Sequence, residues 1–111
     1  MIRVTILKNR DDEYTGFCCE GHALYADAGK DVVCAAVSML AINTANAIES
    51  LAGCDIESTS DKESGMLKIS FPQGLDEKGS LLMDAMVLGI SETEKSYGSR
   101  YVTLTEIKDQ I

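Results

Sequence analysis

A long, alanine-rich segment with almost no charge, residues 32–51, constrains the fold of this 111-residue chain more than any other feature. Asp31 precedes the segment as a typical helix N-cap, and Gly53 follows it as a typical helix stop. Because few charges interrupt the segment, we expect this helix to form the buried centre of the fold. The residues that recur at helical spacing along it are Val33, Val37, Leu40, Thr44, Ile48 and Leu51.

Five short strands and a second helix are predicted around this segment. Apolar alternation and β-branched residues indicate strands over residues 2–7, 14–20, 54–60, 66–71 and 101–104, with the first two paired as a hairpin. The second helix is predicted from residue 75 or 76 to about 97, with Gly98 at its end. The order β-β-α-β-β-α-β favours an α+β fold, in which one mixed or antiparallel sheet carries two helices packed on one face. We expect residues 1–111 to form a single domain.

The charge of the chain restricts its partners. The chain has 18 acidic and 10 basic residues and a net charge of −8, which argues against direct binding of nucleic acid. An acidic surface favours a basic partner, although solubility alone also explains it. The N-terminal residues contain no apolar signal region, and the chain has no uninterrupted run of about 18 apolar residues, so we expect a cytoplasmic protein with no membrane contact. In the cytoplasm the four cysteines should stay reduced.

The only histidine, His22, stands twelve residues before Cys34. With Asp31 at the N-cap, Cys34 lies in the first turn of the predicted helix, where the helix dipole favours the thiolate. His22 follows the second predicted strand, which can carry it to the same helix end. An imidazole within hydrogen-bond range of a thiol can accept its proton. His22 and Cys34 are therefore the candidate catalytic pair of general base and nucleophile.

Two further residues and one loop are candidates for supporting roles. Asp31 either caps the helix or orients His22, and if it caps through the N–H of Cys34, oxyanion donors must come from elsewhere. Ser38, one turn beyond Cys34, either bonds to the catalytic pair or bonds back to its own helix. Residues 23–30 form a predicted loop with Gly21 and Gly29 as hinges, and this loop can close over the pair.

Other interpretations of the cysteines and the histidine are open. Taken singly, His22 can be a solvated surface residue and Cys34 a small core residue. Disulfides that join Cys18 or Cys19 to Cys34 or Cys54 need an oxidising compartment. A zinc site requires several of the cysteines and His22 together, yet neighbouring strand residues face opposite ways and no Cys-x-x-Cys pair exists, so we expect no metal and no cofactor. Along the second strand, we expect one face to hold Cys18, Glu20 and His22 and the other to hold Phe17, Cys19 and Gly21.

The residues around the pair form an extended motif, Gly21-His22-Ala23-x-Tyr25-Ala26-x-x-Gly29-x-Asp31-x-Val33-Cys34-Ala35-Ala36-Val37-Ser38. This motif resembles that of the ribosomal-processing cysteine proteases called Prp. The resemblance implies a homodimeric enzyme that removes an N-terminal extension from a large-subunit ribosomal protein. It implies Cys34 as nucleophile, His22 as general base, Asp31 and Ser38 as supporting residues, and a mobile loop beside the site. The alternative is a non-catalytic ribosome-associated binding module with a buried cysteine.

Overall fold

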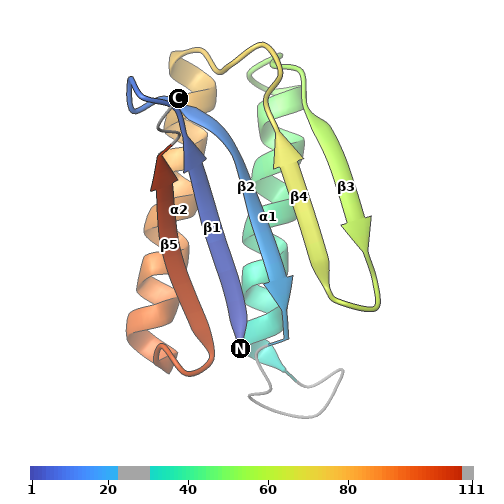
Figure 1. Cartoon of the computed structure of the whole chain (residues 1–111), viewed down its shortest axis with the longest axis vertical. Coiled ribbons are helices and arrows are strands. Elements are labelled where there is room, and N and C mark those ends of the chain that lie inside the picture. The colour runs from blue at the N-terminus through green and yellow to red at the C-terminus, as the bar shows by residue number, and fades with distance from the viewer. Residues whose placement is uncertain (23–30, 109–111) are drawn as a thin grey trace.

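The computed structural model describes residues 1–22 and 31–108, which form a five-stranded sheet with two helices on one face (Figure 1). The helices are α1 (Val32–Ser50) and α2 (Glu77–Tyr97). The architecture and the element order are those predicted. The strands are β1 (Ile2–Lys8), β2 (Tyr14–Gly21), β3 (Glu57–Asp61), β4 (Met66–Ser70) and β5 (Val102–Lys108).

The sheet is mixed, with the strand order β3-β4-β2-β1-β5. β1 and β2 form the predicted antiparallel hairpin, and β5 lies parallel to β1 on its other side. The pairing of Ile2 with Gly21 places the start of β1 beside the end of β2. The same end of the molecule holds the start of α1 and the turn between β3 and β4 (Figure 1). Four chain segments therefore meet at one end of the sheet.

A single apolar layer lies between the sheet and the two helices. Alternation along β1 and β2 directs every second side chain to this layer, and each helix contributes its inner face. Phe17 and Phe71 are in tilted contact inside it, with ring centroids 6.4 Å apart. The largest fully buried side chains are those of Val4, Ile6, Phe17, Val33, Ile48, Ile69, Met83, Met86, Ile90 and Val102.

Helix α1 begins and ends close to the predicted positions, but it is not the buried centre of the fold. Its inner face packs on the sheet, whereas Met39 and Ile42 on its outer side are 70% and 51% exposed. The prediction is wrong because both helices lie in one layer, which leaves their outer sides uncovered. By length and composition alone α1 could cross a membrane, and it is the one such helix within residues 1–22 and 31–108. Here its inner face is part of the core.

Several boundaries differ from the predictions. β3 begins at Glu57 rather than residue 54, and each of its residues is exposed. β5 continues to Lys108 because it pairs along the whole length of β1, beyond the apolar pattern that predicted it. α2 begins at Glu77, after Asp76, whose carboxylate accepts the N–H of Gly79 at 2.8 Å.

Candidate active site

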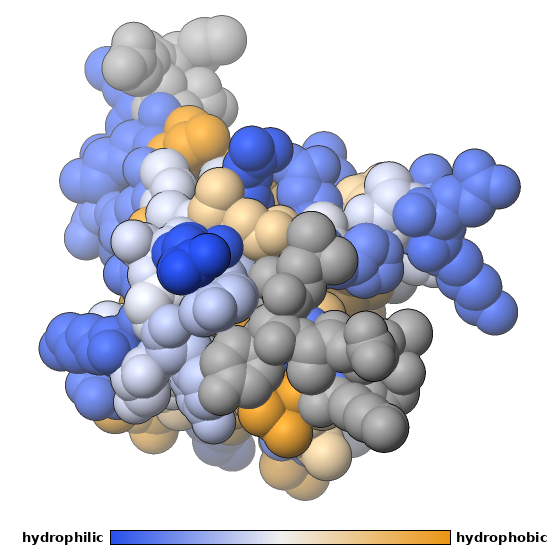
Figure 2. Space-filling view, turned by 90° about the horizontal axis from the view of Figure 1, so that it is seen from below, coloured by the Kyte–Doolittle hydropathy of each residue, from blue (hydrophilic) through white to orange (hydrophobic). Residues whose placement is uncertain are grey.

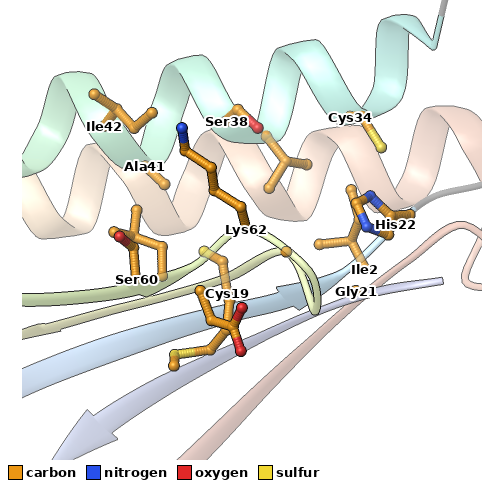
Figure 3. A pocket seen from close by; sticks show the side chains of 15 residues that line it. Ile2, Cys19, Gly21, His22, Cys34, Ser38, Ala41, Ile42, Ser60 and Lys62 are labelled. Carbon is orange, nitrogen blue, oxygen red and sulfur yellow. The ribbon is translucent and has the colours of Figure 1, made fainter. Parts of the chain in front are cut away.

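A pocket of about 360 Å³ lies between the start of α1 and the turn that joins β3 to β4 (Figure 3). His22, Cys34 and Ser38 all line it. The fold therefore brings the predicted catalytic pair together from two separate elements. The remaining lining is largely apolar and includes Ile2, Cys19, Val37, Ala41, Met66 and Leu67.

Cys34 is held in the first turn of α1 by the cap at Asp31. One carboxylate oxygen of Asp31, Oδ1, accepts the backbone N–H groups of Val33 and Cys34, both at 3.0 Å. The thiol of the half-buried Cys34 is directed from the helix toward the imidazole of His22 (Figure 3). The cap thus fixes the backbone of the residue that carries the thiol.

His22 reaches the pocket because β2 ends on an unusual backbone conformation. Gly21 has a φ of +91°, and a Cβ atom at this position would lie 2.4 Å from the carbonyl oxygen of Met1. The positive φ interrupts the strand alternation, so His22 faces the pocket together with Cys19. The prediction that His22 shares a face with Cys18 is therefore wrong.

The structure bears on the predicted supporting residues in different ways. Asp31 caps the helix, which is one of its two predicted roles. Since the N–H of Cys34 is donated to Asp31, the oxyanion donors of a reaction here must include other groups. Ser38 lines the pocket one turn after Cys34, as its spacing predicted. The predicted loop of residues 23–30, which includes Gly29, lies outside the described residues, and the hinge role of Gly21 stays a prediction.

Two of the other cysteines are poor candidates for a nucleophile. Burial raises the pKa of the Cys19 thiol to about 12. Burial, with a smaller contribution from the Glu20 carboxylate, also raises the pKa of Cys18. Both thiols are thus protonated at neutral pH. In the part of the chain that the structure describes, no three or more histidine, cysteine, aspartate or glutamate side chains are grouped so that they could hold a metal ion.

The turn between β3 and β4 also contributes to the pocket, which the sequence did not predict. Lys62 and Gly65 line the pocket, and Lys62 extends from the turn toward α1 (Figure 3). Seen from this end, the molecular surface is mainly polar with small apolar areas (Figure 2). The only signal in the sequence is a glycine at the end of a polar turn, which does not reveal what the turn contacts.

The comparisons with known proteins agree with this arrangement. A sequence model of the family Cysteine protease Prp matches residues 1–103. The chain belongs to the Prp family of cysteine proteases. The ribosomal processing cysteine protease Prp of Bacillus subtilis (strain 168) is 31% identical over 111 residues, which cover 96% of this chain and 99% of that relative. The resemblance seen in the motif is confirmed, and the family assignment favours a protease over a non-catalytic binding module.

Solved structures related to Prp have the same fold. The essential ribosomal processing protease Prp of Staphylococcus aureus, with a covalently linked product peptide, superposes with a TM-score of 0.89 at 25% identity. That match covers 96% of this chain and 100% of the Prp structure. A Streptococcus mutans protein superposes with a TM-score of 0.85 at 33% identity, over 98% of this chain and 96% of the other. The mixed sheet with two helices is thus the Prp fold.

The cap at Asp31 should support both the fold and the activity of this Prp protease. We expect Asp31→Ala to cost about 1 kcal/mol in the free energy of unfolding and to slow peptide cleavage about tenfold, because the first turn that holds Cys34 loosens. Asp31→Asn should preserve both properties, since asparagine caps helices as well as aspartate. Urea unfolding and a cleavage assay measure the two effects.

Asp76 offers a matched control, because it caps α2 through the N–H of Gly79 in the same manner and does not line the pocket. Asp76→Ala should lower stability and leave the cleavage rate of the folded protein unchanged. Reduced cleavage by Asp31→Asn at unchanged stability would contradict a pure capping role and assign Asp31 the second predicted role, orienting His22.

Proposed function

We propose that this Prp family member removes the N-terminal extension of a large-subunit ribosomal protein, with Cys34 as the nucleophile and His22 as the general base. The observation that supports this proposal is the shared pocket, where a thiol from the first turn of α1 is directed toward an imidazole from the end of β2 (Figure 3). Cysteine proteases use a thiol nucleophile that a neighbouring base activates.

The proposed reaction proceeds through an acyl-enzyme. His22 accepts the proton of the Cys34 thiol, and the thiolate attacks the scissile carbonyl carbon. The tetrahedral intermediate collapses as His22 donates the proton to the leaving amine, which leaves a thioester on Cys34. His22 then deprotonates a water molecule that hydrolyses the thioester and regenerates the thiol. Ser38 supports the pair by donating a hydrogen bond to the thiolate or the imidazole.

The charge of the chain and the lining of the pocket support a basic peptide substrate with apolar residues near the cleaved bond. The net charge of −8 speeds the encounter with a basic ribosomal protein. Ile42, Met66 and Leu67, which line the pocket and keep part of their surface exposed, offer an apolar surface to substrate side chains. The Staphylococcus aureus relative has been solved with a covalently linked product peptide, which agrees with peptide binding in this fold.

The proposal includes three properties of the working enzyme. Residues 23–30 gate the catalytic pair, with Gly21 and Gly29 as hinges. The protein acts as a homodimer, and it acts in the cytoplasm, where ribosomal proteins assemble. Sedimentation equilibrium tests the dimer directly, because a monomer at micromolar concentration contradicts it.

Cleavage of a ribosomal protein tests the proposed function as a whole. The purified protein is incubated with a large-subunit ribosomal protein that carries an N-terminal extension and, as a control, with the same protein lacking the extension. Mass analysis of the N-terminus should show loss of the extension in the first case and no change in the second. An intact extension after prolonged incubation contradicts the proposed substrate.

Selective alkylation tests the catalytic pair without any substrate. At pH 7 we expect iodoacetamide to modify Cys34 at least about tenfold faster than Cys18, Cys19 or Cys54, because a thiolate paired with an imidazole reacts far faster than a protonated thiol. Cys19 should be the slowest, since its pKa is raised to about 12. Peptide mass spectrometry at timed intervals measures all four rates, and equal rates contradict the pair.

A further inference from the structure

The turn between β3 and β4, residues 62–65, lies directly against the end of β2 that carries His22. The N–H of Gly21 donates a hydrogen bond to the carbonyl oxygen of Ser64 at 3.1 Å. Within the turn, the Asp61 side chain accepts the N–H of Glu63 at 3.0 Å, which stabilises its tight course. The turn is thus fixed both internally and to the residue that precedes His22.

Gly65 brings the turn into contact with the imidazole itself. Its φ of +67° lies in the left-handed region that glycine adopts without strain. A Cβ atom at this position would lie 3.1 Å from Cε1 and 3.2 Å from Nε2 of His22. It would also lie 2.9 Å from the carbonyl oxygen of Gly21. The glycine therefore leaves only enough space for the ring edge that carries Nε2.

This contact matters because His22 is an exposed residue at the end of a strand. An exposed side chain has access to several rotamers, whereas a general base must hold one geometry relative to the thiol. The turn limits the rotation of the imidazole on the side that carries Nε2. The contact comes from a segment more than 40 residues away in the sequence.

We propose that Gly65 is a positioning residue of this protease, which holds the His22 imidazole in the orientation that serves Cys34. The inference rests on the proposed function, since it assumes that His22 acts as the base. Any side chain at position 65 displaces either the imidazole or the Gly21 carbonyl. Because Gly21 directly precedes His22, both displacements move the base.

Gly65→Ala tests the proposal, with Gly74→Ala as a matched control. Gly74 has a φ of +71°, close to that of Gly65, and a Cβ atom there would meet no atom within 4 Å. The two variants therefore share the strain of a left-handed φ, and the urea midpoint of Gly65→Ala should fall further because its Cβ also meets the Gly21 carbonyl oxygen. Only the Gly65→Ala substitution places a Cβ atom against the His22 ring. We expect its kcat to fall ten- to hundredfold with little change in KM, and Gly74→Ala to match the wild type.

Alkylation of Cys34 by iodoacetamide separates positioning from obstruction of the substrate, because the reagent is small. Gly65→Ala should slow the alkylation at pH 7 and change its pH profile, whereas Gly74→Ala should do neither. In a His22→Ala background, adding Gly65→Ala should cause no further loss, because the residue acts through the ring.

The outcomes distinguish this inference from the proposed function. If wild-type Cys34 reacts no faster than the other cysteines, the catalytic pair itself is wrong and the inference fails with it. If wild-type Cys34 is fast and Gly65→Ala alkylates with the same rate and pH profile as Gly74→Ala, the role of Gly65 alone is overturned. Equal losses from Gly65→Ala with and without His22 also overturn it.

Discussion

Replacement of Cys34 by alanine should reduce cleavage to the background rate, since the variant lacks the sulfur atom that we propose attacks the carbonyl carbon. Removal of the nucleophile from a hydrolase that uses a catalytic triad costs on the order of 10⁶ in kcat, so a loss of every measurable turnover is expected. The fold should survive, because Cys34 is only half-buried and alanine favours the helix. Mass analysis of the substrate N-terminus measures the loss, and circular dichroism verifies the fold.

Cys18→Ala is the matched control for this experiment. Cys18 is half-buried as well, but it pairs with Thr5 and Lys68 across the sheet and does not line the pocket. The Cys18→Ala variant should cleave the substrate at the wild-type rate. Cleavage by Cys34→Ala at a rate comparable to Cys18→Ala contradicts Cys34 as the nucleophile.

Replacement of His22 by alanine should produce the second largest loss, about 10²- to 10⁴-fold in kcat/KM, which is the usual contribution of a general acid–base residue. Since His22 is the only histidine, no neighbouring imidazole can substitute for it. The alkylation rate of Cys34 should also fall toward the rates of the other cysteines. Steady-state cleavage and the pH profile of alkylation measure the two effects.

Ser38→Ala serves as the comparison for His22→Ala, because Ser38 lines the same pocket and its proposed role is only to support the pair. Its loss should be clearly smaller than that of His22→Ala. If Cys34 keeps its fast alkylation in His22→Ala, the helix end alone activates the thiol and His22 is not the base.

Much of the fold could be predicted because its signals are local. The helical spacing of Val33, Val37 and Ile48 identifies α1, and Asp31 marks its first residue through its preference for the N-cap. The motif that contains Gly21, His22 and Cys34 is recognisable for the same reason, because its residues lie close together in the sequence. The Prp family match confirms the resemblance that these residues carry.

The remaining features depend on contacts between distant segments. The length of β5 is set by its parallel pairing with β1, which its own sequence does not contain. The side of the sheet that His22 faces is set by the φ of +91° at Gly21, whereas strand alternation alone predicts the opposite side. The place of Gly65 against His22 results from the pairing of β4 with β2. Apart from the glycines themselves, these features have no local signature in the chain.

Among the described strands, β3 lies at the edge of the sheet beside β4, and each of its residues is exposed. A segment that exposes little apolar surface when it detaches opens at low free energy, well below that of global unfolding. The turn that contacts the imidazole is anchored on one side by this strand. We therefore expect fraying at this edge of the sheet to loosen the turn against His22 while the helices and central strands stay folded, and cleavage to be lost at lower urea concentrations than the fold.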